Sequence, residues 1–406
     1  MERYTNPRAA ALALMTLWAI TGCGNTNMRR IPLDGSDALS WGVEEAAAPD
    51  QARLRILVVG DAGMRDDADD LRPHTNAVLV ARAAQAACAL PLPEHTGDAP
   101  ASRCDLAIFV GDNVYPRGVR EYRDRILFER FTALYTWAGP QYYTLGNHDW
   151  GTMISYDTDV AQAQLRLIAG MEGVHGGTHF YTFKAGQARL TAWDTTYITA
   201  RCKDDPTCGD PSLPPHFDRH PPADPRGATW TLAFGHHPYR SNGLHGDAGD
   251  YIDPFYSGGA LRELMERYVV GKVDLYMSGH DHDMQFHAHD GDSVNAELGR
   301  TGLLISGAGS KCRARDDVSP EEAAGERGVA LYDDHGQLGF AIVDLWPERI
   351  AVTLAQVSAT QRSWRVAFSA SRGRTDAVWS HRDHAGEAQA IDAEGLPVKI
   401  ETEGCE

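Results

Sequence analysis

The segment LRILVVGD, residues 54–61, carries the clearest fold signal in this chain of 406 residues. A short, mostly apolar run leads directly into Gly60 and Asp61, and such a run bounded by glycine is typical of a buried strand. The pattern returns in LAIFVGD at residues 106–112, and a helix is predicted between the two over residues 76–87. Strands that alternate with helices predict an α/β fold with parallel pairing.

A glycine followed by polar residues also comes after three later predicted strands, over residues 142–145, 231–234 and 273–277. Their polar continuations read GNHD, GHH and GHDH. Ligands gather at the carboxyl ends of strands in open α/β sheets, so we expect all five strand ends to meet in one pocket. We also expect the glycine before each polar residue to let the backbone turn sharply.

Closely spaced strands are predicted after residue 301, and we expect them to form a second sheet. They lie near residues 303–306, 328–332, 340–343, 350–354 and 364–368. One large two-sheet domain is therefore expected over residues 53–370. The polar tail, residues 371–406, receives no assignment.

Charge excludes one class of function. Lys and Arg total 38 against 56 for Asp and Glu, a net charge of −18. Nucleic-acid-binding surfaces are basic, so we expect no nucleic-acid partner. The hydrophobic share of 43% is that of a chain able to bury a sizeable core.

The N-terminus predicts export. Arg3 and Arg8 precede an apolar run over residues 9–20, which suits a signal peptide and is too short to span a bilayer. Residues 1–22 are therefore expected to be removed. The small residues before Cys23 resemble the lipobox of bacterial lipoproteins, which implies lipidation of that thiol. The alternative is ordinary secretory cleavage with Cys23 as a bystander.

Lipidation would make this anchor the only membrane attachment, with residues 23–52 as a tether. The chain is then expected to be a periplasm-facing or cell-surface lipoprotein and a monomer.

Six further cysteines remain, and an even number of cysteines in an exported protein indicates disulfides. Of the 15 possible connectivities, the preferred pairs are Cys202 with Cys208, Cys88 with Cys104 and, by elimination, Cys312 with Cys405.

The polar residues at the strand ends are Asp, Tyr, Asn and His, a donor set of oxygen and nitrogen without thiolate. Such a set suits a pair of metal ions, and tyrosinate favours a trivalent ion. Two close ions can activate a water and clamp a phosphoryl group during in-line displacement. The motifs therefore predict phosphoester hydrolysis.

The ordered motifs resemble those of the calcineurin-like metallophosphoesterases. They are GDAG from residue 60, GDNVY from 111, GNHD from 146, GHHP from 235 and GHDH from 279. The tyrosine at position 115 is similar to that of the purple acid phosphatases, most closely the small tartrate-resistant type. WDTT from residue 193 and SGAG from 306 extend the resemblance. It implies a four-layer α/β/β/α sandwich of two mixed sheets.

The resemblance also implies roles for individual residues. An Fe(III) ion would be held by Asp61, Tyr115 and His282. An Fe(II), Zn(II) or Mn(II) ion would be held by Asn147, His236 and His280, and Asp112 would bridge the two ions. His148 and His245 would neutralise phosphate charge and protonate the leaving alkoxide.

The expected function is that of an exported acid phosphatase acting on small phosphomonoesters. Two alternatives stay open: a phosphodiesterase or nucleotidase using the same metals, and a surface lipoprotein whose metal site is only structural.

The polar residues next to the predicted ligands are mostly expected to be structural. His237 is expected to face away from the site, Arg240 to be solvated and His287 to be exposed, while Asp149 and Asp281 are either orienters of histidines or turn residues.

Overall fold

The structure is a computed structural model, which describes residues 29–30, 41–45, 53–65, 71–91, 103–152, 155–200, 213–224, 226, 228–248, 258–313, 329–392 and 394. The signal peptide and the lipidation of Cys23 lie outside the described residues. So do Cys202, Cys208 and Cys405, whose pairings therefore stay predictions.

One mixed sheet begins with the strand predicted first. β3 (Leu54–Val59), β4 (Leu106–Val110), β5 (Gln141–Thr144) and β8 (Val174–His175) pair in parallel, in that order. On the other side of β3 the sheet is antiparallel, through β16 (Leu338–Leu345), β17 (Arg349–Ser358), β18 (Ser363–Gly373) and β19 (Ser380–Asp383).

The second mixed sheet contains the other strands that precede polar motifs. β10 (Ala188–Trp193), β11 (Trp230–Phe234), β12 (Leu275–Ser278) and β14 (Gly302–Ser306) run parallel. β9 (Phe180–Ala185) pairs antiparallel with β10, and beyond β14 lie β13 (Met284–His287) and β15 (Tyr332–Asp334).

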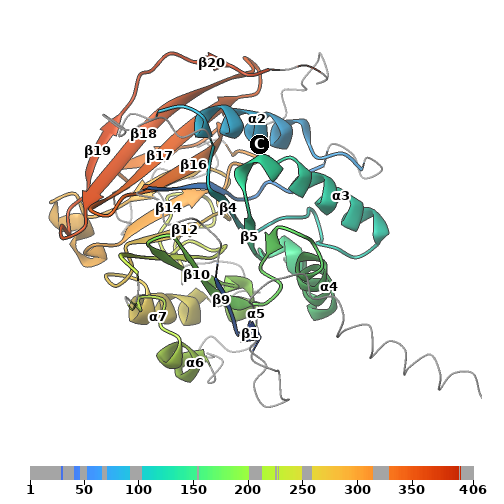
Figure 1. Ribbon diagram of the computed structural model, residues 1–406, viewed down its shortest axis with the longest axis horizontal. Coiled ribbons are helices and arrows are strands. Elements are labelled where there is room, and N and C mark those ends of the chain that lie inside the picture. The colour runs from blue at the N-terminus through green and yellow to red at the C-terminus, as the bar shows by residue number, and fades with distance from the viewer. Residues whose placement is uncertain are drawn as a thin grey trace, which may run out of the picture.

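The two sheets pack face to face between layers of helices. Ile56 and Val58 belong to the core between the sheets, together with Phe234 and Met277. The alternate residue Leu57 faces the other way and joins a second core with residues of the helices. α2 (Thr75–Cys88) and α3 (Tyr122–Ala133) lie on one outer side, and α6 (Leu213–Arg219) and α7 (Gly258–Tyr268) on the other (Figure 1). The predicted four-layer α/β/β/α sandwich is therefore confirmed.

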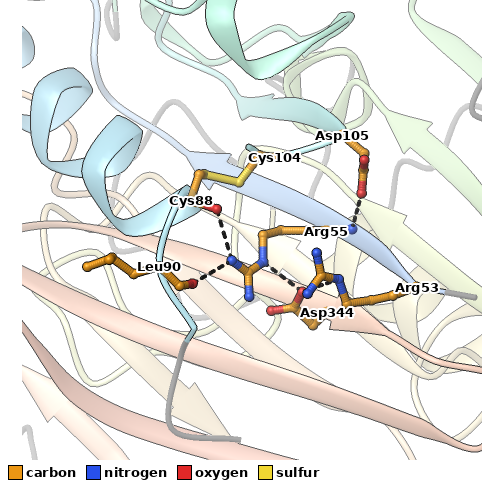
Figure 2. Close-up of a disulfide and its surroundings, with 7 residues drawn as sticks. All are labelled: Arg53, Arg55, Cys88, Leu90, Cys104, Asp105 and Asp344. Atoms are coloured by element: carbon orange, nitrogen blue, oxygen red, sulfur yellow. Dashed lines mark hydrogen bonds and ion pairs between the residues drawn. A yellow bond between two sulfur atoms is a disulfide. The ribbon is translucent and has the colours of Figure 1, made fainter. Parts of the chain in front are cut away.

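A buried charged pair joins two strands near the end of α2. Arg55 of β3 lies opposite Asp344 of β16, with 2.8 Å between Arg55 Nε and Asp344 Oδ1 and both side chains almost fully buried. Figure 2 shows the Arg55 guanidinium also donating to the carbonyl oxygens of Cys88 and Leu90, at 3.0 and 2.9 Å. Cys88 itself is bonded to Cys104, which confirms that predicted disulfide. Arginine thus satisfies carbonyls that the helix end leaves without partners.

The expectation for the C-terminal strands was wrong in one respect. They do not form a sheet of their own, because β14 joins β12 while β16 joins β3. β16 is buried along its whole length, as a central strand must be, and alternation of apolar residues does not say which neighbour a strand will choose. The strand predicted over 328–332 begins later, at Tyr332.

The predicted tail and tether both contain strands. β18 crosses the expected boundary at residue 370, and β19 and β20 (Gln389–Ala390) extend its edge. β2 (Trp41–Glu45) lies within the stretch predicted as a tether and pairs with β9. β19 is exposed throughout, so it lacks the apolar pattern that would have revealed it. Among the described residues, no helix combines the length and apolar character that crossing a bilayer requires.

Candidate metal centre

The seven residues predicted as metal ligands are brought together at the carboxyl ends of five strands, and all seven are buried. They come from the loops after β3, β4, β5, β11 and β12 and are Asp61, Asp112, Tyr115, Asn147, His236, His280 and His282. Two sheets contribute, so the cluster lies where the ends of both meet.

Three of these residues form a first group. The Tyr115 hydroxyl lies 3.0 Å from Asp61 Oδ1 and 3.3 Å from His282 Nε2. The remaining pair, His282 Nε2 and Asp61 Oδ1, is 3.5 Å apart. A phenol, a carboxylate and an imidazole thus direct one donor atom each at a common point.

Three others form a second group. Asn147 Oδ1 lies 2.9 Å from His236 Nε2 and 3.0 Å from His280 Nδ1. The two imidazole nitrogens are 3.1 Å from each other. His236 Nδ1 donates to the carbonyl oxygen of Val110 at 2.9 Å, which leaves Nε2 as an unprotonated nitrogen facing this group.

Asp112 lies between the two groups. Its Oδ1 is 3.5 Å from His236 Nε2, and its charge also acts on the nearby Tyr115 hydroxyl. Asp61, Asp112 and His236 each offer a ligand atom within 4.8 Å of the others. One carboxylate placed this way can serve both groups.

The backbone at these ligands adopts an uncommon conformation. Asp61, Asp112 and His280 have φ values of 55°, 54° and 74°, in the left-handed region that non-glycine residues rarely occupy. Such conformations concentrate at functional sites and cost about 1–3 kcal/mol each. The preceding glycine supplies a positive φ only at Gly111, whereas at Gly146 a Cβ atom would lie 2.2 Å from Asp112 Oδ1. The expectation that glycine makes the turn at every motif was therefore wrong. At Gly146 the absence of a side chain is required instead by close packing against Asp112.

Burial makes the charged forms of these groups costly. It raises the pKa of Asp61 and of Tyr115 well above their ordinary values. It lowers the pKa of His282 to about 3 and that of His280 well below 6.5. Bound cations would reverse this penalty by ionising the acids and accepting the neutral imidazoles. Hard oxygen and imidazole donors, in two groups sharing one carboxylate, fit a pair of such ions.

His148 lies on the open side of the cluster. Its side chain is 23% exposed, and its Nε2 is 3.9 Å from Asp112 Oδ2. The ring is held by Nδ1, which donates to the carbonyl oxygen of Pro116 at 2.8 Å, and it packs against the Tyr115 ring with centroids 4.4 Å apart. Nε2 is therefore the nitrogen on the side of Asp112 and the ligand cluster.

His245 lies on the other side, against the His280 ring at 4.4 Å. Arg313, which the sequence interpretation missed, donates from Nη1 to His245 Nε2 at 3.2 Å. Burial, with a further contribution from Arg313, lowers the pKa of His245 to about 4. Arg313 thus carries the positive charge here, and its sequence signal was the basic KCR run that follows the SGAG motif.

Asp149 ties two ligand loops together. Its carboxylate accepts from the backbone N–H groups of Asn113, Val114 and Gly146 at 2.8–3.1 Å. Gln164 and the Asn113 amide donate to it as well, each at 2.8 Å. Asp149 therefore orients the loops that carry Tyr115 and Asn147, and it is more than a turn residue.

The other neighbouring residues have structural contacts. Asp281 accepts from the backbone N–H of His245 at 2.9 Å and so holds the His245 loop rather than the adjacent histidine rings. His237 is hydrogen-bonded through Nδ1 to Thr195 Oγ1 at 2.8 Å, but its ring packs against the His280 ring with centroids 4.4 Å apart, so it does not lie away from the ligand groups as expected. Arg240 pairs with Glu297 and is not solvated, and His287 is fully buried, so the exposure expected of it was wrong.

Residues 54–284 match the family of calcineurin-like phosphoesterases. The chain belongs to this family. The match covers the five strand-end loops that supply the ligand groups, so the geometry and the family membership concern the same residues.

Two curated relatives are purple acid phosphatases of Arabidopsis thaliana. Purple acid phosphatase 17 is 27% identical over 254 residues, which cover 57% of this chain and 66% of that protein. Purple acid phosphatase 7 is 26% identical over 262 residues, which cover 59% and 73%. The chain thus spans just under two thirds of the first relative and somewhat more of the second.

Two solved structures share the fold of this metallophosphoesterase. PhoD superposes with a TM-score of 0.53 at 10% identity, over 88% of this chain and 76% of PhoD. The purple acid phosphatase PPD1 from seeds of yellow lupin (Lupinus luteus) gives a TM-score of 0.52 at 15% identity, over 82% and 56%. At these identities the likeness establishes the architecture alone.

Proposed function

We propose that this metallophosphoesterase is an acid phosphatase that hydrolyses phosphomonoesters at a dinuclear centre. Fe(III) would be held by Asp61, Tyr115 and His282. Fe(II), Zn(II) or Mn(II) would be held by Asn147, His236 and His280, with Asp112 serving both ions. The observation that carries the proposal is the Tyr115 hydroxyl, 3.0 Å from Asp61 Oδ1 inside the first ligand group, because tyrosinate favours a trivalent ion.

Two cations held at these positions would supply the Lewis acidity that activates a water and neutralises phosphoryl charge. The protein's own groups then act on the substrate from the open side. The phosphorus–oxygen bond to the alcohol breaks as water oxygen bonds to phosphorus, and the departing alkoxide needs a proton. His148 would give it from Nε2, since Nδ1 is occupied by the Pro116 carbonyl.

His245 and Arg313 would act together on the opposite side. The guanidinium supplies a fixed positive charge beside the imidazole, and it can stabilise the negative charge that accumulates on phosphoryl oxygens. With its pKa lowered to about 4, His245 would serve in its neutral form as a hydrogen-bonding group and not as a second acid.

The experiment is to purify the chain without residues 1–22 and compare hydrolysis of p-nitrophenyl phosphate with that of bis(p-nitrophenyl) phosphate from acid to alkaline pH. We expect the monoester to be the better substrate, with its optimum on the acid side. A visible charge-transfer band should be present and should disappear in Tyr115→Phe. A preference for the diester would instead favour the phosphodiesterase alternative.

His148→Ala separates an enzyme from a protein with a merely structural metal site. We expect kcat to fall about 10²- to 10⁴-fold, the usual contribution of general acid catalysis, while metal content stays unchanged. Unchanged turnover in this variant would overturn the role of His148.

We propose further that the protein is exported and anchored by a lipid on Cys23. The support is the N-terminal sequence together with the Cys88–Cys104 disulfide, since disulfides persist in oxidising compartments. Mass spectrometry of the mature N-terminus tests this: a lipidated Cys23 is expected, and an unmodified one would show ordinary secretory cleavage.

A further inference from the structure

A cavity of about 320 Å³ lies beside the candidate centre, and the proposed mechanism does not use it. It is lined by Arg65, Arg117, Arg120, Pro116, Glu121 and Asp124. Three guanidinium groups around one cavity are unusual in a chain whose net charge is −18. Pockets of this size are large enough for small ligands.

Two of the arginines that line the cavity lie on the same loops as the predicted ligands. Arg65 follows Asp61 on the loop after β3, and Arg117 follows Tyr115 on the loop after β4. Pro116 lines the cavity, and its carbonyl oxygen holds the His148 ring. The cavity and the His148 ring therefore share Pro116 as a neighbour.

The two acidic residues of the lining are already engaged by α3. Asp124 Oδ2 accepts from the backbone N–H groups of Arg120 and Glu121 at 2.9 and 3.0 Å. The Glu121 side chain completes a capping box at the same helix start. Their charge is thus partly compensated by the helix itself.

The three arginines are held loosely. Arg65 Nη1 is 3.6 Å from Asp124 Oδ1, and Arg120 Nη2 is 3.6 Å from Asp157 Oδ2, both beyond hydrogen-bond distance. Arg117 is exposed and makes no hydrogen bond or ion pair with any described residue. Guanidinium groups with unused donors bind phosphate through paired N–H groups.

We propose that this cavity is an anion subsite that binds a second phosphoryl group of the substrate. The preferred substrates would then be organic bisphosphates, with one phosphate at the metals and the other among Arg65, Arg117 and Arg120. This inference rests on the proposed function. Because the surface as a whole repels polyanions, local positive charge would be needed to favour such substrates.

The test compares alkyl monophosphates with alkanediol bisphosphates of matched chain length, using the metal-loaded enzyme. We expect kcat/KM to favour the bisphosphate at one linker length. The ratio of bisphosphate to monophosphate kcat/KM should fall about 10- to 100-fold in Arg117→Gln, the value of a hydrogen bond to a charged group. The matched control is Arg166→Gln, an exposed arginine of α4 (Thr158–Ala169), which should keep the wild-type ratio.

Failure of the subsite and failure of the proposed function give different results. Monophosphate hydrolysis with no preference for bisphosphates at any length, or a ratio unchanged in Arg117→Gln, would overturn the subsite alone. If no phosphoester is hydrolysed, the proposed function fails. Calorimetric binding of the same bisphosphates to wild type and to Arg117→Gln then decides the subsite, and equal affinities would overturn it.

Discussion

Asp149 is the residue through which two ligand loops keep their relative position. Its carboxylate receives hydrogen bonds from the loop that carries Tyr115 and from the loop that carries Asn147. Asp112 adds one further link between the same loops, because its Oδ1 accepts from the backbone N–H of His148 at 2.9 Å. Metal affinity should therefore depend on a residue that does not touch the metal.

Asp149→Ala should weaken metal binding about 10- to 100-fold, as loss of groups that orient ligands typically does. Titration with Zn(II), followed by calorimetry, measures this directly. Asp159→Ala, an exposed residue near the start of α4, is the matched control and should bind metal normally. Normal affinity in a folded Asp149→Ala protein would show that the loops hold their positions without it.

The sequence predicted which side chains gather in one cluster because each follows a strand within one local motif. It did not predict Arg313 beside His245, nor the hydrogen bonds that gather on Asp149. These contacts join residues far apart in the chain, as Arg313 and His245 are, and no local periodicity encodes them. The sequence also did not predict the left-handed φ values at Asp61, Asp112 and His280, because the turns were attributed to the neighbouring glycines.

At the scale of elements, Arg55 and Asp344 connect the parallel and antiparallel halves of one sheet. They lie directly opposite each other on β3 and β16. Removing one partner of a buried pair leaves the other charge without compensation, which costs about 3–5 kcal/mol. Asp344→Ala should therefore lower the free energy of unfolding by that amount in urea titrations.

The double variant Arg55→Leu with Asp344→Leu provides the comparison. It removes both charges of the pair but also the donor to the Cys88 and Leu90 carbonyls, so any gain in stability over Asp344→Ala is what the uncompensated charge costs beyond those two hydrogen bonds. A loss below about 1 kcal/mol in the single variant, the usual value for exposed pairs, would contradict this reading.

His287 of β13 should make stability depend on pH. The buried ring donates from Nε2 to Gln285 Oε1 at 2.9 Å, and burial lowers its pKa from 6.5 to about 3. Between these values the unfolded chain binds a proton that the folded chain does not, so the free energy of unfolding falls as pH falls. The slope from this one group is at most about 1.4 kcal/mol per pH unit.

His287→Gln should flatten that dependence below pH 6.5. Urea unfolding at a series of acid pH values measures it. His381→Gln, on the exposed strand β19, is the control and should leave the slope as in wild type. An identical slope in His287→Gln would mean that the ring is protonated in the folded protein.

The elements that sequence predicted best are those buried on both faces. β3 and β4 begin and end at the predicted residues, because five apolar residues in a short run before Gly-Asp allow little else. Assignment of strands to sheets failed for β14 and β16, since pairing partners depend on packing between distant segments. Exposed edge strands such as β19 were missed because they bury no apolar face.

At the scale of the whole molecule, the Cys88–Cys104 disulfide links the end of α2 to the start of β4 across a sequence separation of 16. Loops of this length gain about 3 kcal/mol from the cross-link. Cys88→Ala with Cys104→Ala should lower the free energy of unfolding by about 2–4 kcal/mol. Substitution is preferable to chemical reduction because Cys312 is also disulfide-bonded, and a reductant would not act on the Cys88–Cys104 bond alone.

The disulfide lies apart from the ligand loops, so this double variant should retain the kcat of wild type at temperatures where it is folded. A parallel loss of kcat and stability would show that the bridge also positions the centre.

The negative net charge of the molecule disfavours the approach of anionic substrates. At −18 the surface repels phosphate esters, so a productive site needs concentrated positive charge. Paired cations, Arg313 and the arginine-lined cavity would together provide it along one side of the sandwich. The dinuclear centre would be the main source of this positive charge, and the proposed phosphatase activity depends on it.

The most direct test is the metal content of the purified chain, measured by mass spectrometry beside that of Asp112→Asn. We predict two metal ions per wild-type chain, one of them iron, and loss of both in the variant, because Asp112 serves both ligand groups. A folded wild-type chain that takes up a single ion under metal excess, or an Asp112→Asn chain that still binds two, would contradict a dinuclear centre bridged by Asp112.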